Sequence, residues 1–217
     1  RPGVRRRTGR ASALQIAAAA EPSVGPLAGQ HGVEPALGFL PDAFVLEPRR
    51  TYIPDWYLIG PFPNPLDANS NRLGLDIPYP PEKEADFTKS YPGAGGKTVH
   101  WTLEKTPANG NFDLMRFEPN ELVVAYALTY VYSPTEQTVL LFIGTDDGGK
   151  VLLNDTEVFR KLTIRGAGAD QDTVVLRLSP GWNKLVMKIE NNYGGFGFFA
   201  RVRDDSESLQ FDPLKRK

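Results

Sequence analysis

Hydrophobic positions in this chain come in short runs that are separated by turn-forming residues. The stretch Thr138–Phe159 shows the pattern best, because the apolar runs Val139–Ile143 and Val151–Leu153 flank a Gly- and Asp-rich segment, and Asn154-Asp155 follows the second run. Short β-branched and aromatic runs separated by Asp-Gly and Asn-Asp predict successive antiparallel hairpins. Since the apolar runs are nearly continuous, we expect both faces of these strands to be covered, as in the middle of a sandwich.

Other segments carry the same strand signal. Leu122–Tyr132 alternates strictly, with Tyr126 and Tyr130 on one face and Ala125 and Ala127 on the other. Four more strands are expected at Lys97–Leu103, Thr173–Leu178, Lys184–Glu190 and Phe196–Val202, and a first strand at Ile53–Phe62 is expected to end at Gly60-Pro61. Roughly eight or nine strands without a βαβ pattern predict an all-β, jelly-roll-type β-sandwich.

The chain changes character near residue 50. Residues 1–50 are rich in Pro, Gly and Ala and have little periodicity apart from a short helical pattern at Ser12–Ala20, so we expect a long extended N-terminal tail. Residues 51–204 are predicted to form the sandwich domain and residues 205–217 a C-terminal tail. A signal peptide fits the first 50 residues badly. The chain starts with Arg1 and not Met, which indicates processing or an upstream start.

Composition narrows the function classes. The 217 residues carry a net charge of −1, so no global field favours nucleic acid or an anionic membrane. The absence of cysteine excludes thiolate zinc sites, disulfides and Cys nucleophiles. With 21 Gly and 19 Pro, the composition suits turn-rich β structure better than helices. No apolar run approaches the ~20 residues that span a bilayer.

A set of motifs in residues 51–204 follows a familiar order. The motifs are Trp56-x-x-Ile59-Gly60-Pro61-Phe62, Asp76-x-x-Tyr79-Pro80-Pro81-Glu82, Lys97-x-x-x-Trp101, Tyr130-x-Tyr132-Ser133-Pro134, Gly144-Thr145-Asp146-Asp147-Gly148-x-Lys150-Val151-x-Leu153-Asn154, Leu178-x-x-Gly181-Trp182-Asn183-x-Leu185-x-x-Lys188 and Gly197-Phe198. Together they resemble the galactose-binding-like, carbohydrate-binding-module-like β-sandwiches that occur as non-catalytic parts of bacterial extracellular multidomain proteins. The Asp-Asp-Gly segment is similar to that of anthrax protective-antigen-like lectin domains. The resemblance implies a fold, and this fold hosts many binding roles.

Two interpretations remain open for the adjacent Asp146 and Asp147. In the resembling lectins, adjacent aspartates hold calcium and sugar hydroxyls complete its shell, which implies calcium as the candidate cofactor here. Alternatively, Asp-Asp-Gly is turn chemistry, in which Asp side chains accept hydrogen bonds from nearby backbone N–H groups. Sequence alone does not place the carboxylates that could join the pair, which are Asp76, Glu82, Asp170 and Asp172.

Aromatic side chains form a second candidate set, because aromatic faces stack on sugar C–H surfaces. Trp182 follows Pro-Gly and Tyr193 lies in a Gly- and Asn-rich turn, so these two are the most exposed candidates. We expect core or turn packing for the others, which are Trp56, Tyr79, Trp101 and Phe196.

Catalytic signals fail when they are tested. His31 and His100 have no visible base partner or third ligand, and Gly-x-Ser-x-Gly is absent. The stretch Gly93–Thr98 mimics a P-loop but carries Tyr91 where the motif needs Gly, and a strand is expected to follow it. No two acids are nominated for glycoside hydrolysis. The sequence therefore predicts a protein that is not an enzyme.

The basic start of the chain is the last candidate. Its arginines could contact an acidic subunit or acidic lipid headgroups, or could serve only as a solvated, solubilising tail. They are Arg1, Arg5, Arg6, Arg7 and Arg10.

The sequence leaves two hypotheses. In the first, the protein is a non-catalytic interaction subunit whose sandwich and tail bind other protein subunits of a larger, extracytoplasmic assembly at the bacterial cell envelope. In the second, it is a carbohydrate-binding module, calcium-dependent, with its glycan site at the Asp146, Asp147, Trp182 and Tyr193 loops.

Overall fold

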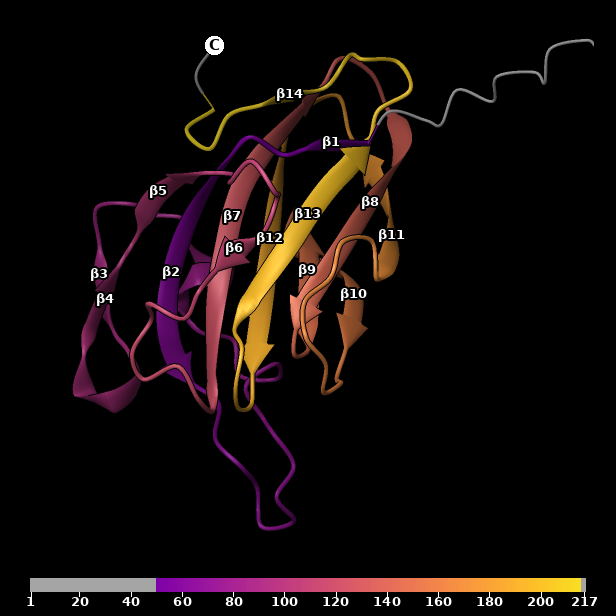
Figure 1. Ribbon diagram of the computed structural model, residues 1–217. Coiled ribbons are helices and arrows are strands. Elements are labelled where there is room, and N and C mark those ends of the chain that lie inside the picture. Colours follow the sequence, from indigo (N-terminus) through magenta and orange to yellow (C-terminus); the bar gives the residue numbers. More distant parts are fainter. Residues whose placement is uncertain (1–49, 216–217) are drawn as a thin grey trace, which may run out of the picture. The chain divides into compact units, whose positions relative to one another are not determined.

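The computed structural model describes residues 50–215, which form an antiparallel β-sandwich (Figure 1). The predicted all-β, jelly-roll-type fold is confirmed. The N-terminal tail, its arginines and the helical pattern Ser12–Ala20 lie outside the described residues. No helix among the described residues is long and apolar enough to cross a membrane.

Two sheets make up the layers of the sandwich. The smaller sheet has the order β1-β13-β8-β11, with β6 paired to β13, and the larger has the order β10-β9-β12-β7-β2-β5, with β14 paired to β7. The smaller sheet contains β1 (Arg50–Tyr52), β6 (Phe112–Asp113), β8 (Gln137–Asp146), β11 (Asp172–Leu178) and β13 (Gly197–Arg203). The larger contains β2 (Asp55–Pro63), β5 (Thr102–Lys105), β7 (Val123–Ser133), β9 (Gly149–Leu153), β10 (Thr156–Lys161), β12 (Gly181–Asn191) and β14 (Gln210–Phe211). A separate hairpin, β3 (Ser90–Pro92) and β4 (Thr98–His100), encloses the 3₁₀ turn η1 (Ala94–Gly96), and the only helix described is α1 (Pro80–Lys83).

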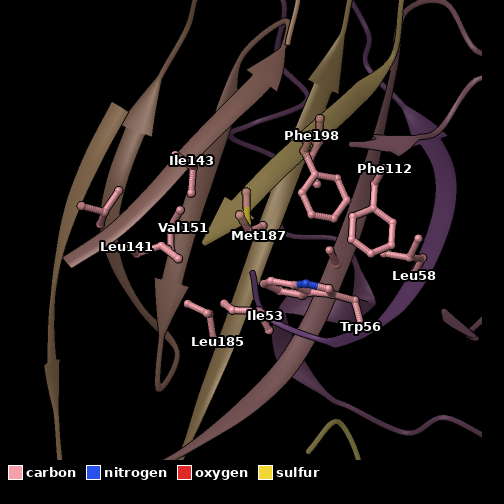
Figure 2. Packing of buried hydrophobic residues seen from close by; sticks show 14 of the residues in the cluster. Ile53, Trp56, Leu58, Phe112, Leu141, Ile143, Val151, Leu185, Met187 and Phe198 are labelled. Carbon is pink, nitrogen blue, oxygen red and sulfur yellow. The ribbon is translucent and has the colours of Figure 1, made fainter. Parts of the chain in front are cut away.

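The main core lies between the two sheets (Figure 2). Its side chains come from alternate strand positions, because successive residues of a strand point to opposite faces. Phe198 stacks on Phe112 with ring centroids 4.7 Å apart and meets Trp56 edge-on at 5.8 Å. Met187 and Ile143 are buried beside them. Fully burying a large apolar side chain contributes about 1.5–3 kcal/mol, so this layer supplies most of the stabilisation.

A second apolar cluster covers the outer face of the larger sheet. The strict alternation predicted for β7 is confirmed, with Ala125 in the inner core and Tyr126 in the outer cluster. Residues 75–92, which we name the flap, pack over this face. Phe87 of the flap stacks on Tyr57 with centroids 3.9 Å apart, and Tyr79 stacks on Phe62 at 5.0 Å. The larger sheet is therefore buried on both sides over part of its area.

One of the two predicted hairpins in Thr138–Phe159 is wrong. Strands β9 and β10 do form a hairpin, and its turn residues Asn154 and Asp155 have φ of 49° and 68°, as a type I′ turn requires. Strands β8 and β9, however, belong to different sheets, so residues 147–148 cross from one layer to the other. Asp-Asp-Gly looks the same locally in a hairpin and in a crossover, and long-range pairing decides between them.

Two predicted boundaries also shift. Strand β2 does not end at Gly60-Pro61 but continues to Pro63, with a register shift against β7 between Ile59 and Phe62. In the predicted C-terminal tail, β14 pairs with Tyr132 and Val131 of β7, so part of residues 205–217 belongs to the sheet.

Candidate functional site

Two carboxylates flank a glycine at one end of the smaller sheet. Gly197 of β13 lies opposite Asp113 of β6 on one side and opposite Asp146 of β8 on the other. Directly opposed residues point to the same face of a sheet. Because Phe112 and Phe198 are buried in the core, their neighbours Asp113 and Gly197 face outward. Gly197 therefore lies between two acids, and all three residues line a hollow.

This hollow, which we name the Asp146 hollow, has a volume of about 270 Å³. It lies at the end of the sandwich where β8 and β12 finish and β13 begins, the lower end in Figure 1. Glycines are needed there, because a Cβ at Gly195 would lie 2.4 Å from Oδ2 of Asp146. Its remaining walls come from Asn111, Met115, Gly166, Ala167 and Phe196.

Asn111 contributes an unusual atom to the hollow. Its side-chain Oδ1 is buried and has no hydrogen-bond partner among the described residues. Buried polar atoms almost always find a partner, and one that does not has a waiting acceptor position that a ligand or water can fill.

Asp146 itself is only partly buried. Burial raises the pKa of its carboxyl, and the neighbouring Asp147 raises it further, while a hydrogen bond from the backbone of Ala167 works in the opposite direction. A carboxylate that has lost hydration and lies next to another acid gains from a ligand that donates hydrogen bonds or carries positive charge.

The side chain of Asp147 points into the interior of the protein and stabilises the neighbouring loops. Its Oδ1 accepts a hydrogen bond from the backbone N–H of Arg165 at 2.8 Å, and its Oδ2 accepts one from the backbone N–H of Asn192 at 2.9 Å. Arg72 lies 3.7 Å from Oδ2. The carboxylate of Asp147 thus connects the loops that carry Arg72, Arg165 and Asn192. This role agrees with the turn-chemistry interpretation, in which Asp side chains accept hydrogen bonds from backbone N–H groups.

Behind Asp147 lies a second buried acid. Glu190 is 0% exposed, its Oε1 accepts from Nδ2 of Asn64 at 2.9 Å, and Nε of Arg72 lies 3.2 Å away. Burial raises the pKa of Glu190. Arg72 also donates to the backbone carbonyl of Thr163 at 3.0 Å, so it ties the loop after β2 to the β10–β11 loop.

The four residues predicted as one binding site do not meet. Tyr193 is 58% exposed on the β12–β13 loop, which also carries Gly195 of the hollow. Trp182 lies at the opposite end of β12, about 30 Å from the Asp146 end at roughly 3.3 Å per residue. The structure therefore brings Asp146 and Tyr193 to one end, turns Asp147 inward, and places Trp182 elsewhere.

The other carboxylates considered from the sequence have separate partners. Asp172 pairs with Lys161 and Arg165, and Asp76 pairs with Arg160. Asp170 pairs with Arg201. None of the three lines the Asp146 hollow.

Glu82 lies on the outer face of the larger sheet, in a buried ionic network that the sequence did not reveal. Its Oε1 accepts from Nζ of Lys188 and from the hydroxyl of Tyr126, both at 2.7 Å, and its Oε2 accepts from Nζ of Lys150 at 2.9 Å. Lys188 also donates to the carbonyl of Ile77. Although burial works against it, the bonds from Lys188 and Lys150 hold the pKa of Glu82 below its ordinary value.

The predicted absence of a P-loop agrees with the structure, because Gly93–Thr98 leads into β4 and not into a helix. His100 is exposed on β4. Within residues 50–215, no three His, Cys, Asp or Glu side chains gather in an arrangement that could hold a metal ion. Asp113 and Asp146 supply oxygen atoms of the type that calcium prefers to the wall of the hollow, and Oδ1 of Asp113 already accepts the backbone N–H of Met115 at 2.9 Å.

The fold is an antiparallel β-sandwich with a small polar hollow at one end. No family model and no curated protein sequence matches the chain. Among solved structures, it is similar to the PA14 domain of the MpAFP antifreeze protein, with 19% identity over 42% of this chain and 48% of that one and a TM-score of 0.33.

Two glycosidase structures are also similar. The β-glucosidase from Kluyveromyces marxianus in complex with glucose has 16% identity over 70% of this chain, with a TM-score of 0.40, and the GH31 α-xylosidase from Xanthomonas citri has 10% identity over 76%, with a TM-score of 0.34. The chain spans only 16% and 18% of these two proteins and about half of the PA14 structure. Likenesses of this size assign no activity to the chain.

Proposed function

We propose that this protein is a non-catalytic binding module that holds the terminal unit of a saccharide in the Asp146 hollow. The observation that carries the proposal is the partly buried carboxylate of Asp146 in a hollow that Asp113 also lines. A saccharide presents several hydroxyl donors on a compact ring. Such a ring can donate hydrogen bonds to carboxylate acceptors on the wall of the hollow.

The size of the hollow supports a small ligand. At about 270 Å³ it falls just below the roughly 300–1,000 Å³ of pockets for drug-sized molecules. The exposed ring of Tyr193, on the loop that forms one wall, supplies an apolar face for stacking against sugar C–H groups.

Calcium enters the proposal as a bridge between protein and sugar. Asp146 and Asp113 would supply oxygen ligands to the ion, which would polarise the sugar hydroxyls and offset the carboxylate charges. Asp147 takes no part, because its oxygens already accept the backbone N–H groups of Arg165 and Asn192.

A glycan array followed by isothermal titration, each run with calcium and with EDTA, tests this proposal. Neutral saccharides should bind, Asp146→Asn should weaken binding at least tenfold, and the exposed Asp205→Asn, remote from the hollow, should leave it unchanged. Retention of no neutral saccharide, or equal affinity of D146N, would overturn the proposal. If the protein released new reducing ends from a bound glycan, the proposal that it is non-catalytic would be wrong.

A protein partner at the same end is the second candidate function. Several large apolar side chains are exposed on the loops at this end, namely Leu66, Met115, Leu162, Ile164 and Tyr193. Exposed apolar residues at one end of a domain mark interaction surfaces, which favours the hypothesis of an interaction subunit. Co-purification of the native protein followed by mass spectrometry tests it, with Ile164→Ser, at the most exposed of these positions, expected to reduce partner recovery. A partner retained equally by I164S would speak against this surface.

A further inference from the structure

A second hollow lies on the outer face of the larger sheet, where the flap stops. It has a volume of about 410 Å³, inside the range of small-molecule sites. Trp182, near the start of β12, lies about 30 Å along that strand from the loop that binds Asp147, so the two hollows are separate. The residues that line the second hollow are Ala85, Tyr130, Asn154, Asp155, Trp182, Lys184 and Lys215.

Strand register explains why aromatic and basic residues meet there. Lys184 of β12 lies opposite Tyr130 of β7, and Trp182 lies opposite Tyr132, so all four point to the outer face. The flap contacts Lys188 through Ile77 and Glu82, and it contributes Ala85 to the wall of the hollow at Trp182. Trp182 contacts Tyr132 edge-on with centroids 5.4 Å apart and keeps part of its ring exposed.

The charged groups of this hollow give it a positive excess. The ammonium of Lys215 lies 4.0 Å from the centroid of the Tyr130 ring, and Lys184 forms an ion pair with Asp155. Two cations and one carboxylate leave one net positive charge against an aromatic wall.

We propose that this second hollow binds an acidic saccharide, a sugar that carries a carboxylate. The two ammonium groups suit the carboxylate, the indole suits the C–H face of a sugar ring, and Asp155 supplies an acceptor for sugar hydroxyls. A simple inorganic anion would use the lysines but would gain nothing from Asp155 or Trp182. A ligand that combines negative charge, hydroxyl donors and an apolar face accounts for all four groups.

Intrinsic fluorescence offers a direct test. Of the three tryptophans, Trp56 and Trp101 are buried in the two apolar clusters, and Trp182 alone is partly exposed. Titration of the full chain with digalacturonic acid should change the emission of Trp182. The methyl ester of the same disaccharide keeps its shape and loses its charge, so it should bind about tenfold more weakly or worse.

Substitutions then separate the roles of the charges. Lys184→Gln and Lys215→Gln should each weaken digalacturonate binding about tenfold, since each removes a charge-assisted contact. Asp155→Asn should tighten binding about two- to fivefold, because Asn keeps an Oδ1 acceptor for the sugar hydroxyls and tolerates the positive φ of this turn, while Lys184 loses its competing carboxylate. The matched control is Lys97→Gln, an exposed lysine on another part of the chain, which should leave binding unchanged.

Three results would overturn the proposal: unchanged Trp182 emission at millimolar digalacturonate, equal affinity for the methyl ester, or weaker binding by D155N. Equal competition by hexaglutamate would assign the hollow to an acidic peptide instead. These measurements use residues and probes that differ from those of the Asp146 hollow, so each proposal can fail alone.

Discussion

Asp146 and Asp147 show how adjacent residues of one type acquire different roles. Asp146 is the last residue of β8 and points outward into the hollow, whereas Asp147 begins the crossover to the other sheet and points inward. Each carboxylate then meets different surroundings. The first keeps access to a ligand, and the second accepts backbone donors from two loops.

Gly195 controls the position of the Asp146 carboxylate. Gly195→Ala should weaken saccharide binding strongly, because the new Cβ would lie 2.4 Å from Oδ2 and force the carboxylate to move. The matched control is Gly166→Ala in the same wall, where the nearest atom of Asp146 is 4.0 Å from the new Cβ, an ordinary contact. Titration calorimetry on both variants checks this. Normal binding by G195A would show that the carboxylate does not hold the ligand.

Glu82 is the acid whose loss should cost the most stability. Glu82→Gln would leave the buried Lys188 and Lys150 without their shared counter-charge, a change that costs about 3–5 kcal/mol. Chemical denaturation monitored by fluorescence measures this loss in the free energy of unfolding. Glu84→Gln, which removes an exposed acid paired with Lys89 on the same segment, should leave the unfolding midpoint where it is. Equal midpoints for E82Q and the wild type would contradict the network's role.

At the scale of elements, the position of the flap on the sheet depends on aromatic contacts and on one buried charged residue, Glu82. Residues 75–92 contain a single short helix, and such a helix gains little from its own hydrogen bonds. The flap is held instead by aromatic stacking of Phe87 and Tyr79 and by Glu82, whose carboxylate reaches Lys188 and Lys150 in the sheet below. The flap therefore anchors through tertiary contacts and not through local structure.

The buried Lys188 makes this contact sensitive to alkaline pH. Burial lowers the pKa of Lys188 from 10.5 to about 8, although Glu82 opposes the shift. Between these values the unfolded chain binds more protons than the folded one, so the contribution of Lys188 to stability rises with pH. The wild type should gain stability relative to Lys188→Met from pH 8 to pH 10. Unfolding free energies at four pH values check this, and a difference that falls across the window would contradict it.

At the scale of the whole molecule, the sandwich is self-contained. The apolar residues of both clusters lie between Ile53 and Phe211, and Val45–Lys217 forms one compact unit by its internal contacts. Its two hollows lie on different sheets and near opposite ends of the strands. Such a layout suits a module that contacts two ligands at once.

A fragment that starts at Val45 should therefore fold alone. We expect a single cooperative thermal transition and unchanged binding at both hollows, because every residue proposed for binding lies within this unit. Calorimetry and the two titrations check this. If the fragment kept saccharide binding but lost a co-purifying partner, the partner contact would belong to residues 1–44.

The sequence predicted the fold well, but of the three polar residues that line the Asp146 hollow it nominated only Asp146. Alternation in residues 122–132 and the Asn154-Asp155 turn are local signals, and both were confirmed. Asn111 and Asp113 were missed, because β6 is two residues long and acquires its place only by pairing with β13. Lys188 lies in the strand predicted at Lys184–Glu190, and its contacts to Ile77 and Glu82 of the flap were not visible in the sequence.

What the sequence determined by itself is the β-sandwich, since the alternation of apolar residues and the turn chemistry act over a few neighbouring residues. Tertiary structure decided which polar groups meet. Pairing between strands distant in sequence set Asp113 and Asp146 on either side of Gly197 and separated Trp182 from both. The physical reason is that a hollow depends on contacts between segments far apart in the chain, and no local pattern encodes those contacts.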